Sequence, residues 1–143
     1  AHGCDHPILY RDEDFVARVR EITDGKGVPV VYDSVGKDTF MKSLDCLSPR
    51  GILASFGQAS GKVPPVDVAS LGPRGALWLT RPTIFAYNGT RAELEANAAE
   101  IFDVVLSGAV RIEPGHVYDL RDAARAHRDL EGRRTTGSII LVP

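Results

Sequence analysis

Two short stretches of the chain place glycine and small polar residues directly after an apolar run. Ser34–Gly36 follows the run 28–32, and Phe56–Ala59 follows the run 52–55. Strands of a buried parallel sheet end in this way. Nucleotides bind at the carboxyl edge of such sheets, where small residues let a flat ring or a ribose lie against the backbone. The pattern is also typical of strand-ending turns without a ligand, and these residues alone leave both interpretations open.

Other residues with chemical potential form weaker patterns. His2 and His6 lie on either side of Cys4, but this spacing suits no standard zinc site, so we predict a solvated terminus and no metal site. His127 falls on the predicted inward face of a helix and is expected to be a packed, hydrogen-bonded histidine. No Ser/His/Asp or Cys/His arrangement stands out, so we nominate no catalytic residue.

The elements that must position the two glycine turns alternate between strand and helix. We predict strands at 7–10, 28–32, 52–55 and 76–81. One helix is predicted to carry the acidic run 12–14 in its first turn, and a second helix is predicted over 38–47. A loop rich in Gly, Pro and Ser follows the third strand. This alternation predicts an α/β fold with a parallel sheet.

The phosphate-binding loop of a nucleotide fold is missing from the sequence. No Gly-x-Gly-x-x-Gly motif precedes the strands, and the first residue is Ala1 rather than methionine. We therefore expect the chain to be the distal part of a longer enzyme, with residues 1–89 forming the distal half of a Rossmann-type parallel sheet. Strand 28–32 would then be an apolar sheet edge. We expect segment 7–10, another copy of the chain, or residues outside the sequence to cover it.

The character of the sequence changes near residue 89. Thr90 and Glu93 have the spacing of a capping box and predict a long helix that ends near Gly108. A strand at 116–118, an alanine-rich helix at 122–131 and a terminal strand at 138–142 are predicted to follow, with the first strand as the local partner of the last. The long helix should direct its apolar residues inward: Leu94, Ala98, Ile101, Phe102 and Val105.

Composition excludes several classes of function. The 143 residues are 43% hydrophobic and 25% charged, which is ordinary for a globular protein. A net charge of −2 does not provide the basic face that nucleic acid requires. No apolar run approaches the roughly 20 residues of a membrane span. The two cysteines are expected to be reduced thiols, and we predict a cytoplasmic protein.

Several motifs together resemble the zinc-free, zeta-crystallin-like quinone oxidoreductases of the medium-chain dehydrogenase/reductase superfamily. The similarity runs in order along the whole chain and implies its C-terminal portion only, with residues 90–143 belonging to the catalytic domain. The motifs that carry it are Val31–Gly36, Ser43–Leu47, Arg50-Gly51, Ser55–Gly61, Thr80–Pro82, Ala124–Glu131 and Thr136–Ser138.

The resemblance implies NADPH as cofactor and a quinone or enone as hydride acceptor. It places Tyr10 near the adenosine phosphate, Ser34 against the cofactor, and Arg133 reaching back to it from the C-terminal part. The nicotinamide half would lie against Phe56, Gly57, Gln58 and Ala59, with Thr83, Ile84 and Phe85 bordering its pocket. The lysine that usually selects NADPH in the family has no counterpart here.

The resemblance also implies a homodimer, in which strand 76–81 pairs with the same strand of a second copy. Two alternatives to a quinone oxidoreductase stay open. One is a zinc-free reductase of enones or enoyl thioesters, and the other is a non-catalytic binding or structural module. With the phosphate loop outside the sequence, we expect this chain to bind NADPH weakly or not at all and to be inactive by itself.

Overall fold

The computed structural model describes residues 3–143, so His2 lies outside the described residues. The backbone divides between Tyr87 and Asn88 into two compact units. The first unit contains, in order, α1 (Phe15–Ile22), β1 (Val28–Asp33), α2 (Phe40–Asp45), β2 (Leu47–Ser55), η1 (Val68–Leu71), β3 (Trp78–Thr80) and α3 (Ile84–Tyr87). The second contains α4 (Arg91–Leu106), β4 (Pro114–Asp119), η2 (Leu120–Asp122), α5 (Ala123–Glu131) and β5 (Ser138–Val142).

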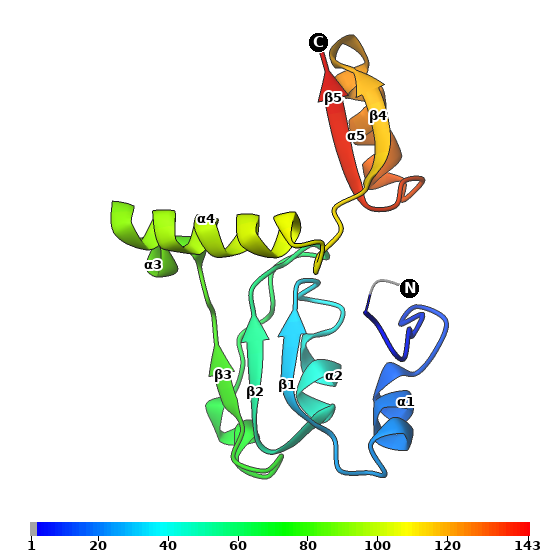
Figure 1. Cartoon of the computed structure of the whole chain (residues 1–143). Coiled ribbons are helices and arrows are strands. Elements are labelled where there is room, and N and C mark those ends of the chain that lie inside the picture. Colours follow the sequence, from blue (N-terminus) through cyan, green and yellow to red (C-terminus); the bar gives the residue numbers. More distant parts are fainter. Residues whose placement is uncertain (1–2) are drawn as a thin grey trace. The chain divides into compact units, whose positions relative to one another are not determined.

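A three-stranded parallel sheet of order β1-β2-β3 forms the centre of the first unit (Figure 1). Val30, Ile52 and Trp78 share one row across it. Helix α2 connects β1 to β2 and packs against both strands, while α1 packs against α2. The predicted α/β class with a parallel sheet is confirmed.

The core of the first unit lies between α2 and the sheet. Its hydrophobic cluster contains Phe40, Leu44, Leu47, Leu53 and Leu77. Leu53, at the centre of β2, has no exposed surface. The opposite face of the sheet is open, since Tyr32 and Trp78 are 75% and 67% exposed. The sheet is therefore covered on the α2 face only within the described chain.

The predicted strand at 7–10 is wrong. These residues form an irregular turn in which the Leu9 amide donates to Glu13 Oε1 at 2.9 Å, while the amides of Asp12 and Glu13 donate to the Leu9 carbonyl. The backbone groups of this segment form hydrogen bonds within the turn, and segment 7–10 does not pair with β1. Helix α1 then begins after Asp14, whose carboxylate accepts from the Val16 amide, so the acidic run precedes the helix rather than filling its first turn.

The other predicted elements of the first unit are present with altered ends. Helix α2 ends at Asp45, because Leu47 already pairs with Val28 at the start of β2. Strand β2 is irregular near Arg50, which has a positive φ of 62° and donates its amide to the Gly75 carbonyl. Strand β3 is shorter than predicted, and the short helix η1 was not predicted.

In the second unit, the capping box at Thr90 and Glu93 opens α4 as predicted. Strands β4 and β5 pair in parallel, which confirms the predicted partnership of the terminal strand. Helix α5 packs against β4. Helix α4 leaves its apolar side chains exposed to solvent, and Ile101 and Phe102 are 58% and 64% exposed. The predicted burial of that face is therefore wrong for the described chain.

The prediction for His127 is also wrong. This histidine is exposed, and the buried residue of α5 is Ala126. No described helix is both long enough and apolar enough to span a bilayer.

The two cysteines should differ sharply in reactivity. Burial raises the pKa of the Cys46 thiol to about 11, whereas Cys4 is exposed. Because the thiolate is the reactive form, only about one Cys46 in a thousand is ionised at pH 8. Iodoacetamide at pH 8 should alkylate Cys4 alone in the folded chain and both residues in urea, as read by peptide mass spectrometry. Equal alkylation of both cysteines in the folded chain would show that this core is not formed.

Candidate functional site

The last residue of β1, Asp33, is a buried carboxylate at the carboxyl edge of the sheet, 4% exposed. Its Oδ1 accepts from the Val35 and Gly36 amides at 2.8 and 2.9 Å. Its Oδ2 accepts from the hydroxyls of Thr39 and Ser43, both at 2.8 Å. The side chain therefore holds the turn after β1 against the start of α2.

The charge of Asp33 is stabilised by hydrogen bonds alone. Burial by itself raises the pKa of this carboxyl. Hydrogen bonds from the Gly36 amide and the two hydroxyls lower the pKa by a larger amount, so it lies below its ordinary value. No ion pair to Asp33 is found in the described part of the chain. An ionised Asp33 is thus the native form at neutral pH.

The turn after β1 is joined to the segment after β2 by backbone hydrogen bonds. The Phe56 amide donates to the Asp33 carbonyl at 2.9 Å, and the Ala59 amide donates to the Ser34 carbonyl at 3.2 Å. Ser60 adds two bonds to the Val35 carbonyl, from its amide at 2.8 Å and its hydroxyl at 2.7 Å. Both predicted glycine turns therefore lie at one edge of the sheet and in direct contact.

Two glycines make this contact possible. A Cβ added to Gly57 would lie 2.6 Å from the Ser34 Cα, and one added to Gly36 would lie 2.9 Å from the Gln58 Cα. Gly36 also has a positive φ of 88°, which side chains disfavour. The result is two backbone segments in direct contact, which together we call the shelf (residues 33–36 and 55–61).

A cavity of about 250 Å³, the Tyr10 cavity, lies on one side of the shelf. It brings together Tyr10 and Ser34, two of the residues predicted to contact the cofactor. The turn at 8–10, which stands where a strand was predicted, forms one wall, and α1, β1 with the turn after it, and α2 form the others. The lining includes Ile8, Tyr10, Phe15, Tyr32, Ser34 and Thr39.

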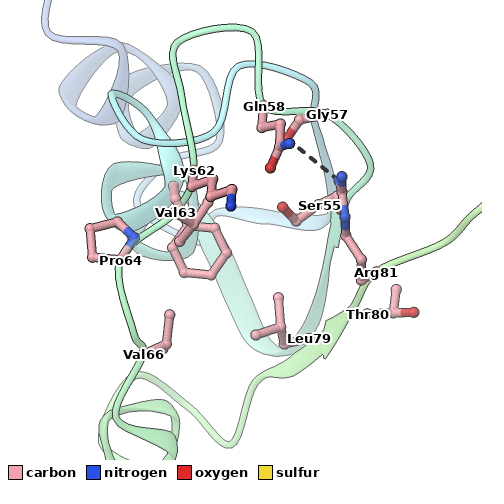
Figure 2. A pocket seen from close by; sticks show the side chains of 11 residues that line it. Ser55, Gly57, Gln58, Lys62, Val63, Pro64, Val66, Leu79, Thr80 and Arg81 are labelled. Atoms are coloured by element: carbon pink, nitrogen blue, oxygen red, sulfur yellow. Dashed lines mark hydrogen bonds between the residues drawn. The ribbon is translucent and has the colours of Figure 1, made fainter.

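A second cavity, the Gln58 cavity, is about 370 Å³ in volume and includes Gly57 and Gln58 (Figure 2). Its wall is mostly apolar, with Phe40, Val63 and Leu79, and it carries two cationic side chains, Lys62 and Arg81. Figure 2 shows Arg81 reaching from the end of β3 toward Gly57.

The remaining predicted residues lie outside both cavities. Phe56 and Ala59 are exposed on the shelf, and Phe56 is 50% exposed. Thr83, Ile84 and Phe85 lie at the start of α3, where Ile84 and Phe85 are 68% and 84% exposed. Arg133 belongs to the second unit, in the turn after α5, with a positive φ of 55°.

Sequence reasoning missed two residues that organise the shelf. Asp33 enters the sequence analysis only within the motif Val31–Gly36. An acidic residue at the end of an apolar strand is an unusual feature that could have identified it as a structural residue. Arg81 donates from Nη1 to the Ser55 carbonyl at 2.6 Å, and no feature of the sequence reveals that contact.

Comparison with known proteins agrees with this geometry. The family model described as zinc-binding dehydrogenase matches residues 2–141. The chain belongs to the zinc-binding dehydrogenase family. Yet residues 3–143 contain no group of three or more His, Cys, Asp or Glu side chains that could hold a metal ion. We assign no chemical step to a metal ion at these residues.

The predicted resemblance to quinone oxidoreductases is confirmed. Quinone oxidoreductase of Pseudomonas aeruginosa is 51% identical over 99% of this chain and 44% of its own length. A 2-haloacrylate reductase of Burkholderia is 49% identical over 99% of the chain and 43% of its own length. The structure of Escherichia coli quinone oxidoreductase complexed with NADPH matches with a TM-score of 0.89 and 48% identity, over 95% of this chain and 42% of that one. This family member thus spans less than half the length of these relatives.

Replacing Asp33 by Asn should destabilise the protein in a pH-dependent way. The amide group keeps one acceptor and loses the charge, so we expect about 1–3 kcal/mol less free energy of unfolding at pH 7. Because the folded pKa of Asp33 is lowered, its contribution is complete above about pH 5 and is lost as pH falls below about 4. Urea unfolding between pH 3 and pH 7 measures both effects.

The matched control is Asp24→Asn, at an exposed turn position with a positive φ of 51° that asparagine tolerates. It should leave the free energy of unfolding unchanged within about 0.5 kcal/mol. A difference between wild type and Asp33→Asn that stays constant down to pH 3 would contradict an ionised Asp33.

Proposed function

We propose that this chain is the distal cofactor-binding part of an NADPH-dependent quinone oxidoreductase. Residues 1–89 would belong to its dinucleotide-binding domain and residues 90–143 to its catalytic domain. The proposal rests on the shelf, where two strand ends meet through Gly36 and Gly57 between two cavities. The names of the relatives and the NADPH in the matched Escherichia coli structure support it.

The cofactor would run along the shelf. When bound, NADPH supplies the hydride that reduces an electron-poor quinone. Tyr10 and Ser34 would take its adenosine and ribose side in the Tyr10 cavity, and the backbone at Gly57 would approach the nicotinamide half closely because it carries no side chain. Phe56, Gln58 and Ala59 would border the same half.

The remaining assignments follow the same cofactor path. Thr83, Ile84 and Phe85 would border the nicotinamide pocket, and Arg133 would bind the cofactor from the second unit. We assign no acid, base or nucleophile, since positioning the nicotinamide and excluding water suffice for hydride transfer. We further propose a zinc-free enzyme, as the resemblance to zeta-crystallin-like quinone oxidoreductases implies, and the donor side chains among residues 3–143 gather into no metal site. We propose a cytoplasmic location because both cysteines are free thiols.

A second candidate is reduction of an activated alkene. The 2-haloacrylate reductase of Burkholderia matches this chain with 49% identity, nearly as closely as the quinone oxidoreductase of Pseudomonas aeruginosa. The shelf would serve this reaction equally, because NADPH supplies the hydride in both. The two candidates differ only in the acceptor.

A chimera tests the function of this sequence in a complete enzyme. This chain replaces the matched 142 residues of the Pseudomonas aeruginosa quinone oxidoreductase. We expect NADPH oxidation, followed at 340 nm, with 1,4-naphthoquinone as acceptor. Turnover with 2-chloroacrylate that the intact Pseudomonas aeruginosa enzyme does not show would favour the second candidate. A folded chimera that binds NADPH with neither acceptor reduced would favour a non-catalytic module.

Two glycine variants of the chimera examine the shelf itself. Gly57→Ala places a methyl group 2.6 Å from the Ser34 Cα and should displace the turn, lowering kcat/KM for NADPH on the order of tenfold to a hundredfold. Gly72→Ala is the control, since its Cβ would meet nothing closer than 3.6 Å. Equal kinetics for the two variants would argue against a cofactor on the shelf.

We also propose a homodimer through strand 76–81. Strand β3 ends the sheet order and pairs only with β2 within the described chain, and its Trp78 is 67% exposed. An open edge of this kind pairs readily with the same strand of another copy.

Light scattering tests the dimer. The chain should have twice its monomer mass of 15.5 kDa, and Trp78→Lys should restore the monomer mass because a charged edge strand disfavours pairing. Leu9→Lys is the matched control, since Leu9 is also 67% exposed but lies away from β3, and it should stay dimeric. A wild-type chain that is monomeric at every concentration would exclude the dimer.

A further inference from the structure

The segment Ser55–Gly57 of the shelf is hydrogen bonded along both of its edges. On the β1 side, the amides of Phe56 and Gly57 donate to the Asp33 carbonyl at 2.9 and 3.2 Å. On the β3 side, the carbonyls of Ser55 and Gly57 accept from Arg81 Nη1 at 2.6 and 3.5 Å. Backbone thus holds one edge, while a side chain holds the other.

The register of the sheet explains why a side chain is needed. In a parallel pair of strands, a residue that bonds to the neighbouring strand faces one residue of that strand. Its N–H donates to the carbonyl of the residue before that facing residue, and its C=O accepts from the amide of the residue after it. The bond from Phe56 to Asp33 follows this rule, since Phe56 stands opposite Ser34 when the register of Asp33 with Ser55 is extended. The same rule applies between β2 and β3.

Extending the register of Ala54 with Thr80 places Ser55 opposite Arg81. The next amide, which should donate to the Ser55 carbonyl, belongs to Pro82 and carries no hydrogen. Strand β3 therefore ends at Thr80. The Arg81 guanidinium occupies the position of the missing donor, and its charge strengthens the bond.

We propose that Arg81 is a positioning residue, which replaces the donor that Pro82 lacks and so fixes the shelf at Phe56–Gln58. In the enzyme it would hold this segment for the nicotinamide half of NADPH, a role that rests on the proposed function. A lysine would not serve equally, because its ammonium is a flexible point charge and lacks the planar guanidinium whose Nη1 contacts both carbonyls.

Four variants separate this role from general stability. Arg81→Met keeps the aliphatic stem and removes the donor, and Arg81→Lys keeps the charge. Pro82→Ala restores an amide, so the double variant R81M/P82A should regain the bond to the Ser55 carbonyl. Arg74→Met is the control, since it removes an arginine of the same unit that pairs with Asp45 at 2.9 Å, in contacts that do not include the shelf.

Amide hydrogen exchange of the 143-residue chain tests the position of the shelf without any cofactor. In Arg81→Met, the amides of Phe56 and Gly57 should exchange roughly tenfold faster, because their segment loses one of its two edges. Pro82→Ala in the same background should reverse the change. The Val35 and Gly36 amides, which Asp33 holds, should exchange as in wild type.

The chimera tests the role in cofactor binding. The Kd for NADPH should rise about tenfold in Arg81→Met, less in Arg81→Lys, and return toward wild type in R81M/P82A. The Kd for 2′,5′-ADP, which lacks the nicotinamide half, should not change in any variant. A variant that was only unstable would weaken both ligands alike.

The outcomes are distinguishable. Unchanged exchange at Phe56 and Gly57 in Arg81→Met would overturn the positional role, as would a double variant that recovers nothing. Faster exchange with an unchanged Kd for NADPH would overturn the cofactor role. A wild-type chimera that binds no NADPH would overturn the proposed function, while the exchange experiment would still decide the position of Arg81. If Arg81→Met does not fold, Arg81→Lys with and without Pro82→Ala gives the same comparison.

Discussion

The buried carboxylate of Asp33 is the interaction on which the site depends. A charge in a core is costly unless polar groups surround it, and here two amides and two hydroxyls do so without a cation. Because these donors come from the turn after β1 and from the start of α2, ionised Asp33 fixes three pieces of structure together. Within this turn Ser34 stays exposed, where a ligand could contact it.

The shelf shows how a sheet edge can be rigid and open at once. Its rigidity comes from backbone bonds between 33–35 and 56–60, and its openness comes from glycine where the two segments touch. Arg81 completes the arrangement on the β3 side, where proline has ended the strand. Main-chain bonds therefore join the two segments directly, and the side chains of Asp33 and Arg81 hold them on either side.

Sequence predicted the parts of this fold that depend on local patterns. The apolar runs at 28–32 and 52–55 predicted strands, and the spacing of Thr90 and Glu93 predicted a helix start. The strands form, but their predicted burial holds on one face only, since Tyr32 is 75% exposed. Segment 7–10 has the same apolar character, but its bonds to Glu13 are a local alternative that composition does not reveal. Burial of α4 and α5 was mispredicted because it depends on which elements pack together.

The general position of the candidate site was predictable from the sequence, but its individual contacts were not. The meeting of the two glycine turns followed from parallel strands, since their carboxyl ends share one edge. The two hydroxyls that donate to Asp33, those of Thr39 and Ser43, lie six and ten residues away from it along the chain. The contact of Arg81 with Ser55 depends on the register of two strands. Neither distance nor register can be read from residue types alone.

Relatives named for different acceptors match this chain almost equally, at 51% for a quinone oxidoreductase and 49% for a 2-haloacrylate reductase. A segment that adapted to the acceptor would resemble one of them clearly more than the other. We therefore infer that the matched segment carries what the two reactions have in common. In the proposed function, a shelf built around backbone contacts would suit that role, and the choice of acceptor would fall to residues elsewhere in the enzyme.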